Sequence, residues 1–207
     1  MTAPAPLLVL ATANDHKVLE MRQILAPLLP GIDPERIVSM TQFDVPSPVE
    51  DAATFQGNAA IKARAVADAT GLPALADDSG LSVDAMNGAP GIFSARWAGA
   101  HGDDAANLNL LLDQIADLRD ADRGAQFVCA AALALPGGAI EAAEGVVRGT
   151  LIREPRGTGG FGYDPAFVPD GFEVTSAELT AEQKNAISHR GRALAALAPA
   201  IRKALRD

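Results

Sequence analysis

The amino-acid sequence predicts one α/β domain built around a central mixed sheet. Strand-type apolar runs alternate with helical periodicity through the first half of the chain, which favours parallel strands connected by helices. Two later apolar runs flank a Pro-Gly-Gly turn and predict a β-hairpin, which adds antiparallel pairing. The length of 207 residues suffices for a single domain over residues 1–207 and is too small for two ordinary domains.

Apolar periodicity and breaker residues place the elements of the N-terminal half. Residues 7–12 form a continuous apolar run of strand type, and apolar residues then recur at helical spacing from Val18 until Pro30-Gly31 ends the helix. The further expected elements are a short strand over 37–40, a Pro-rich loop over 43–51, and a helix over 54–69 that is closed by Gly71 as a C-terminal cap.

Turn residues and one capping pattern place the elements of the second half. Residues 74–76 are expected to form a short strand that ends at Asp77, with 81–86 extended and 87–91 in a turn-rich loop. The further expected elements are a helix over 107–115, hairpin strands over 125–135 and 140–151, a Gly/Pro-rich segment over 153–169, and a helical C-terminal region opened by a capping box of Thr180 and Gln183.

Charge and composition exclude several classes of function. The net charge is −9 without any basic run, whereas proteins that bind long nucleic acids need a Lys/Arg surface. No stretch approaches the roughly 20 apolar residues of a membrane span, and residues 1–10 lack the Lys or Arg that begins a signal peptide. The single Cys129 cannot form an internal disulfide and is expected to be a buried thiol. We therefore expect a cytoplasmic protein that binds neither a nucleic-acid polymer nor a membrane, although local positive charge still permits a small anionic ligand.

A strand that leads into a helix provides the first candidate site, at residues 11–17. The first turn of a helix offers free backbone N–H groups and the positive end of the helix dipole, both of which suit a phosphate. Lys17 is expected in that turn, where a bound anion would offset its unfavourable position against the dipole. The alternative is an ordinary N-cap formed by Asn14 or Asp15.

Adjacent carboxylates supply the second candidate site, in Asp77-Asp78-Ser79-Gly80. Two acids at the end of an apolar strand are costly unless they are solvated, paired or bound to a cation. Such oxygen groups suit Mg²⁺, which binds carboxylates together with substrate phosphate oxygens. Glu50, in the Pro-rich loop, is a further candidate ligand. The alternatives are an acidic turn and a solvated surface acid.

A glycine-rich segment, residues 157–165, forms the third candidate site. It matches G-x-G-x-x-G, but a dinucleotide-binding fingerprint is excluded because that motif must open a long helix and Pro165 follows here. Glycines allow the backbone to approach a planar base while Phe161 stacks on it. The alternative is that Phe161 belongs to the core.

The fourth candidate site lies in residues 183–191. Lys184 and Ser188 are one helical turn apart and therefore share a helix face. His189-Arg190-Gly191 is expected to turn the chain. The alternative for this His-Arg pair is an ordinary surface location.

Taken together, these four stretches resemble the Ham1 or inosine-triphosphate pyrophosphatase family, in its bacterial branch. The order and spacing of five segments carry the resemblance: 11–17, 54–63, 76–99, 153–164 and 177–194. It implies an elongated, two-lobed α/β domain with a cleft between the lobes, and a homodimer. It also implies a Mg²⁺-dependent pyrophosphatase that cleanses the nucleotide pool by hydrolysing deaminated purine nucleotides, such as ITP, dITP and XTP, to the monophosphate and pyrophosphate.

The resemblance also implies a role for each matching residue. Asp78 corresponds to the proton acceptor, and the accompanying metal-site acids are Glu50, Asp77 and Asp78 itself. The substrate contacts near the phosphates are Thr12, Ala13, Asn14, Asp15, His16, Lys17, Lys62 and Ser79. The contacts on the nucleoside side are Phe161, Gly162, Tyr163, Asp164, Lys184, His189 and Arg190.

The mechanism implied by the family is metal-assisted hydrolysis. Mg²⁺ would neutralise the triphosphate, lysines would hold its oxygens, and Asp78 would orient or deprotonate the water that cleaves between the α and β phosphates. His189 and Arg190 are expected to donate to the 6-carbonyl of the base, which would select hypoxanthine and xanthine over adenine. Gly57 stands where many members of the family have Glu. If that Glu is a metal ligand in those members, this protein lacks the ligand. The alternatives are a phosphatase that releases orthophosphate and a non-catalytic nucleotide-binding protein.

Overall fold

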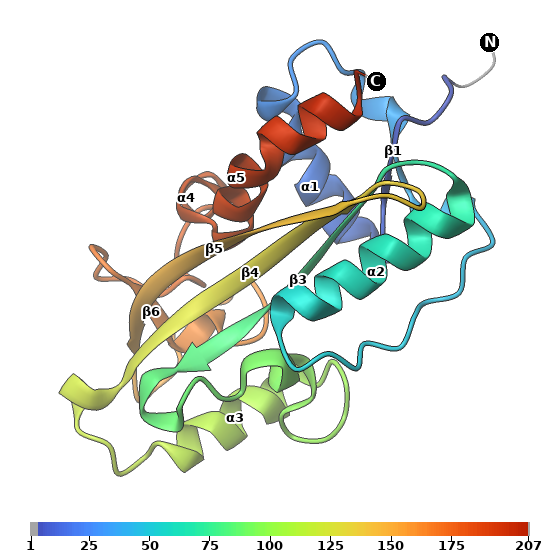
Figure 1. Ribbon diagram of the computed structural model, residues 1–207. Coiled ribbons are helices and arrows are strands. Elements are labelled where there is room, and N and C mark those ends of the chain that lie inside the picture. The colour runs from blue at the N-terminus through green and yellow to red at the C-terminus, as the bar shows by residue number, and fades with distance from the viewer. Residues whose placement is uncertain (1–3, 207) are drawn as a thin grey trace. The chain divides into compact units, whose positions relative to one another are not determined.

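The computed structural model describes residues 4–206, apart from the side chains of His16 and Ala181, and forms an α/β domain with a six-stranded sheet (Figure 1). The strand order is β2-β1-β3-β4-β5-β6. β1 pairs in parallel with both β2 and β3, whereas β5 and β6 are antiparallel. The sheet is therefore mixed, as predicted.

The regular elements lie close to their predicted positions. The strands are β1 (Leu8–Leu10), β2 (Ile37–Ser39), β3 (Ala74–Val83), β4 (Gly124–Ala134), β5 (Ile140–Leu151) and β6 (Phe167–Pro169). The α-helices are α1 (Asp15–Leu28), α2 (Phe55–Thr70), α3 (Asp104–Gln114), α4 (Ala181–Ile187) and α5 (His189–Ala204). No helix in the described part of the chain is both long and apolar enough to cross a membrane.

The described residues group into two compact units, and strands β3, β4 and β5 contribute to both. Unit 1 comprises residues 4–78, 129–145 and 190–206, and unit 2 comprises residues 79–128 and 146–189. The predicted cleft between two lobes stays a prediction.

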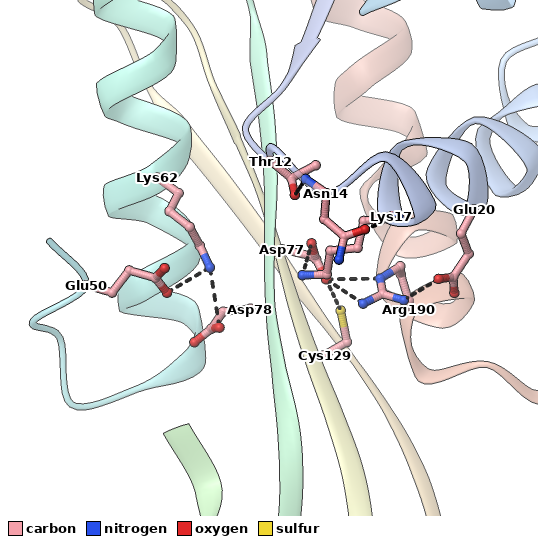
Figure 2. Close-up of polar contacts among 10 residues, drawn as sticks. All are labelled: Thr12, Asn14, Lys17, Glu20, Glu50, Lys62, Asp77, Asp78, Cys129 and Arg190. Carbon is pink, nitrogen blue, oxygen red and sulfur yellow. Dashed lines mark hydrogen bonds and ion pairs between the residues drawn. The ribbon is translucent and has the colours of Figure 1, made fainter. Parts of the chain in front are cut away.

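The core of unit 1 forms where α1 and α5 cover one face of the sheet. Apolar residues of α1 at helical spacing, such as Met21 and Leu25, are buried against Leu8 and Leu10 of β1, and Leu194 of α5 joins the same cluster. Helix α2 covers the opposite face (Figure 2). The predicted C-terminal cap is confirmed, because Gly71 ends the helix at φ +68°, and at the other end Thr54 is the N-cap, with its Oγ1 accepting from Gly57 N.

Unit 2 has its own apolar core. Leu108 and Leu111 of α3 pack with Leu81 of β3, and Phe167 of β6 is fully buried in the same cluster. The capping box of Thr180 and Gln183 at the start of α4 is confirmed.

Two predicted boundaries were wrong. Strand β3 does not stop at Asp77 but continues to Val83, because cations on either side of the sheet neutralise the two acids in its middle. The His189-Arg190-Gly191 stretch is not a turn but the start of α5; α4 ends at Ile187, and Ser188, its C-cap, connects the two helices.

Candidate active site

Asp77 and Asp78 point to opposite faces of β3 (Figure 2). Successive side chains of a strand alternate between the two faces of its sheet, so adjacent acids cannot converge on one point. Asp77 faces α1 and α5, whereas Asp78 faces α2. Both acids belong to unit 1, and each has its own cationic partners.

Asp77 is the centre of a buried ion-pair cluster. Lys17 Nζ lies 3.1 Å from Asp77 Oδ1, and Arg190 donates through Nε to Asp77 Oδ2 at 3.0 Å. Arg190 also bonds through Nη1 to Glu20 Oε2, at 2.8 Å. Burial by itself raises the pKa of Asp77, but the charges of Lys17 and Arg190 outweigh burial and hold the pKa far below its usual range. Asp77 is therefore an ionised anchor for two cations.

Lys17 reaches this cluster because it lies in the first turn of α1. Asn14 is the N-cap: its Oδ1 accepts from Lys17 N at 3.2 Å, and its own N donates to Thr12 Oγ1 at 3.2 Å. The ammonium of Lys17 thus belongs to the same turn as the N-terminal amides of α1, and both carry positive charge that suits phosphate.

Cys129 lies beneath Asp77, with its Sγ 3.9 Å from Asp77 Oδ2. Burial and the negative charge of Asp77 raise the pKa of the Cys129 thiol far above its usual value. The thiol is therefore protonated and unreactive, and the predicted buried thiol is confirmed.

Arg190 is buried between two carboxylates. The side chain is only 4% exposed, and its donors bond to Asp77 and Glu20 within unit 1. The carboxylates raise the pKa of Arg190 despite its burial. A guanidinium paired in this way holds Asp77 in position, and the role of Arg190 at the base edge stays a prediction.

Lys62 joins two carboxylates on the other face of β3. Its Nζ lies 2.8 Å from Glu50 Oε2 and 3.4 Å from Asp78 Oδ1 (Figure 2). Asn58, one turn earlier on α2, donates through Nδ2 to Asp78 Oδ2 at 3.2 Å. One face of α2 therefore supplies both a cation and an amide to Asp78.

The sequence analysis did not identify Asn58 as a site residue. In the structure, Asn58 connects helix α2 to Asp78 of β3 and to the loop that carries Glu50. The side chain is 2% exposed, and its Oδ1 accepts from Ala52 N at 3.0 Å in the loop that carries Glu50. A detectable signal was present in the sequence, because Asn58 interrupts the apolar stripe that Phe55, Ala59 and other residues form on α2. A buried amide at such a position needs hydrogen-bond partners. Here the partners are Asp78 and the backbone N of Ala52, both of which belong to the candidate site.

The environment makes Asp78 a stronger base than an exposed aspartate. Burial raises the pKa of Asp78, and the opposing effects of Lys62 and the Asn58 hydrogen bond only partly offset this, so the pKa stays above its usual value. Burial lowers the pKa of Lys62, but the charges of Asp78 and Glu50 outweigh it and the pKa is raised. A charged lysine thus accompanies a carboxylate that has an increased affinity for a proton.

The acids predicted to share a metal are divided between the two faces of the sheet. Across residues 4–206, no group of three or more His, Cys, Asp or Glu side chains is arranged to hold a metal ion. Both oxygens of Asp77 contact cations on the face away from Glu50 and Asp78, and its predicted place in one ligand set with them stays a prediction. Glu50 and Asp78 converge on the ammonium of Lys62, and two carboxylates around one positive charge fit a hard cation such as Mg²⁺.

In unit 2, the glycine-rich segment exposes Phe161 next to a lysine. Phe161 is 66% exposed, which excludes a core position, and Lys184 Nζ lies 5.0 Å from the centre of its ring. Lys184 also forms an ion pair with the buried Asp164. The ring is therefore presented by the loop together with a positive charge.

Tyr163 and His189 support unit 2 from inside. Tyr163 is 5% exposed and its hydroxyl donates to the backbone oxygen of Ser94 at 2.8 Å, so it supports the loop instead of offering its hydroxyl to a ligand. The ring of His189 stacks on Phe127, with centroids 5.3 Å apart. Of the remaining predicted residues, Thr12 and Ser79 are half-buried, Ala13 and Asp15 are exposed, and the side chain of His16 lies outside the described part of the structure.

Comparison with known proteins accounts for nearly the whole chain. Residues 8–200 match the sequence profile of the Ham1 family. The chain belongs to the Ham1 family. Among curated relatives, the dITP/XTP pyrophosphatase of Streptomyces coelicolor is 58% identical over 198 residues, which cover 96% of this chain and 98% of the relative. The protein of that name from Leifsonia xyli is 57% identical over 94% of each chain.

Solved structures of Ham1 proteins share the fold. A HAM1 protein from Coxiella burnetii superimposes with a TM-score of 0.86 at 44% identity, covering 96% of this chain and 100% of that one. A structure from Mycobacterium abscessus, described as a nucleoside-triphosphatase and dITP/XTP pyrophosphatase, has a TM-score of 0.78 at 49% identity, covering 93% and 98%. At these identities the likeness extends beyond the fold to the family as a whole.

Proposed function

We propose that this Ham1-family protein is a nucleoside-triphosphate pyrophosphatase that hydrolyses dITP, ITP and XTP to the monophosphate and pyrophosphate. The observation that carries the proposal is the cluster of Glu50, Lys62 and Asp78, in which a basic carboxylate, a second acid and a charged lysine meet. The activity named for the bacterial relatives supports the same substrates. These substrates belong to the nucleotide pool, so we also propose a cytoplasmic location.

Asp78 is the proposed acceptor of the proton from the attacking water. Its raised pKa strengthens its affinity for a proton, while Asn58 and Lys62 fix the orientation of the carboxylate. Lys17 and Lys62 are the proposed triphosphate contacts. Each ammonium is held by a carboxylate, which keeps its long side chain oriented toward the site before substrate binds.

Glu50 and Asp78 are the proposed ligands of Mg²⁺. The bound ion would neutralise triphosphate charge and polarise the phosphate that is attacked. Asp77 contributes differently, because it holds Lys17 and pairs with the buried Arg190. Lys62 pairs with both Glu50 and Asp78, and its single positive charge reduces the repulsion between these acids.

The proposed contact for the base is Phe161, with Lys184 beside it. An exposed aromatic ring stacks on any purine, so it contributes affinity without selecting the base. Selection of hypoxanthine and xanthine over adenine requires donors that face a 6-carbonyl, which adenine lacks. We propose that His189, which the sequence predicts at the base edge, contributes such a donor.

Product analysis tests the proposed reaction. Purified protein is incubated with ITP and Mg²⁺, and pyrophosphate and orthophosphate are measured separately. We expect equimolar monophosphate and pyrophosphate, with ITP and XTP turned over faster than ATP. Orthophosphate as the first product would identify a phosphatase, and nucleotide binding without turnover would identify a non-catalytic binder.

A matched pair of variants tests the metal ligands. Glu50→Gln should raise the Mg²⁺ concentration needed for half-maximal rate, because it removes one of two proposed ligand charges. Asp51→Asn changes an exposed neighbouring acid by the same chemistry and should leave that concentration unchanged. Equal behaviour of the two variants would exclude Glu50 as a ligand.

A further inference from the structure

Asp104 contacts the loop that carries Phe161. It is the first residue of α3, and its Oδ2 accepts a hydrogen bond from the backbone N of Gly162 at 2.9 Å. The preceding amide, that of Phe161, donates to Asp164 Oδ2 at 2.8 Å. Two consecutive amides are therefore held by two different carboxylates, and all of these residues belong to unit 2.

The loop needs such anchors because its own sequence favours many conformations. Gly160 and Gly162 flank Phe161 at φ +71° and +60°, which are left-handed conformations that glycine adopts without strain. The Phe161 ring is mostly exposed, so the core does not hold it. The direction of the ring thus depends on where the flanking backbone is fixed.

The two anchors are not equivalent. Asp164 is buried, is itself part of the glycine-rich segment, and pairs with Lys184. Asp104 comes from a separate element, since α3 is packed into the core of unit 2 through Leu108 and Leu111. It therefore fixes the loop against a rigid helix. Burial raises the pKa of Tyr163, and the negative charge of Asp104 raises it further. This effect agrees with the position of Asp104 beside the glycine-rich segment.

We propose that Asp104 is a positioning residue for the nucleoside, which acts by fixing the Gly162 amide and thereby the direction of the Phe161 ring. This inference rests on the proposed role of Phe161 in stacking on the base. It assigns to Asp104 no contact with the substrate and no part in the chemical step. Removal of the carboxylate should therefore weaken binding of the nucleotide while turnover of bound nucleotide is retained.

Asp103, the adjacent acid, offers a matched control. Asp103 is the N-cap of α3, where its Oδ1 accepts from Ala106 N at 3.0 Å. Asp103→Ala should lower Tm by about 2–4 °C through loss of the cap and leave the KM for ITP unchanged. Asp104→Ala keeps the cap but should raise KM about 10- to 150-fold, the effect of one lost charge-assisted hydrogen bond, with kcat within about twofold.

Two further variants separate positioning from other roles of the charge. Asp104→Asn keeps an oxygen acceptor, so its KM should be near the wild-type value. If Asp104 acted only through its charge at the helix dipole, the KM of Asp104→Asn would be as high as that of Asp104→Ala. In a Phe161→Ala background, Asp104→Ala should add no further increase in KM, because the two residues act through one another. A normal KM for Asp104→Ala, no rescue by Asn, or additive effects of the two substitutions would each overturn the inference.

Failure of the inference is distinguishable from failure of the proposed function. A normal KM for the Phe161→Ala variant would remove the proposed stacking role, whereas a raised KM there with a normal KM for Asp104→Ala would remove only the role of Asp104. The contact itself is measured without turnover from the backbone NMR signal of Gly162. In Asp104→Ala this amide should shift upfield and lose protection against hydrogen exchange, and an unchanged signal would contradict the contact.

Discussion

Two neighbouring aspartates on β3 differ in the direction of their pKa shifts and in their charged partners. Asp77 is buried between Lys17 and Arg190, which lower its pKa, whereas Asp78 has a raised pKa and contacts Lys62 and Asn58. The cause is the alternation of side chains along a strand, which sends consecutive residues into different surroundings. One acid is thereby suited to hold cations and the other to accept a proton.

Asp78→Asn should reduce kcat by about 10²- to 10⁴-fold, the usual loss when a positioned base is removed. The amide keeps the size of the side chain, so Tm should change by only a few degrees. The measurement is ITP turnover at saturating Mg²⁺, with thermal unfolding as the control for folding. A variant that keeps more than half of the wild-type kcat would exclude Asp78 as the base.

Asp77→Asn should destabilise the protein by about 3 kcal/mol at pH 7, the lower end of the range for breaking a buried ion pair, because the buried guanidinium keeps Glu20 as its one remaining charged partner. The pKa of Asp77 is lower in the folded than in the unfolded state, so its contribution is fully present above the unfolded value, about pH 4, and declines as the pH falls below it. Urea unfolding of both proteins at several pH values measures the difference. A difference that stays constant down to pH 3 would contradict the lowered pKa.

Helix α2 is the element that organises the proposed catalytic face. Its N-terminal half carries Asn58 and Lys62, and its first turn lies against Ala52 in the loop that delivers Glu50. Gly57 allows this approach, since a Cβ there would lie 2.5 Å from the Cβ of Ala52. The glycine that departs from the family pattern thus has a packing role, and a Glu at this position would require the loop to move.

Gly57→Ala should therefore destabilise the protein by about 1–3 kcal/mol, the range for overpacking, and raise the Mg²⁺ requirement by displacing the Glu50 loop. Thermal unfolding and the Mg²⁺ dependence of ITP hydrolysis measure the two effects. Gln56→Ala, an exposed change in the same turn, is the control and should be close to neutral. An unchanged Tm for Gly57→Ala would show that the loop relaxes without cost.

At the scale of the whole molecule, the chain brings distant segments of the sequence into each unit. Unit 1 joins Lys17 of α1, Asp77 of β3 and Arg190 of α5, so Asp77 and Arg190 pair across 113 positions of the sequence. Unit 2 likewise joins α3 to the glycine-rich segment. These ion pairs join residues that are far apart in the sequence, so they form only when the chain folds.

We also expect the protein to be a dimer in solution, as the family resemblance implies. Multi-angle light scattering at micromolar concentration should give about twice the chain mass of 21.3 kDa. A mass equal to that of a single chain would contradict the dimer. Repeating the measurement after serial dilution would show whether the association is concentration-dependent.

The sequence alone determined the elements and most of the chemical groups. Hydrophobic periodicity, the Gly71 and Thr180 caps and the Pro-Gly-Gly turn depend on nearby residues, so they predicted the helices and the hairpin correctly. The motifs at residues 11–17 and 77–80 pointed to Lys17 and Asp78, and the family resemblance added Lys62; the roles of these residues stay predictions.

Only the tertiary structure decided which of these groups act together. The sequence suggested one metal set from Glu50, Asp77 and Asp78, but the pleat of β3 separates Asp77 from the other two. The motif also gave no sign that the folded chain buries the guanidinium of Arg190 between Asp77 and Glu20. Motifs specify residue types and spacing, but the partner of a charge is set by long-range packing, because a buried ion is stable only where the fold places an opposite charge.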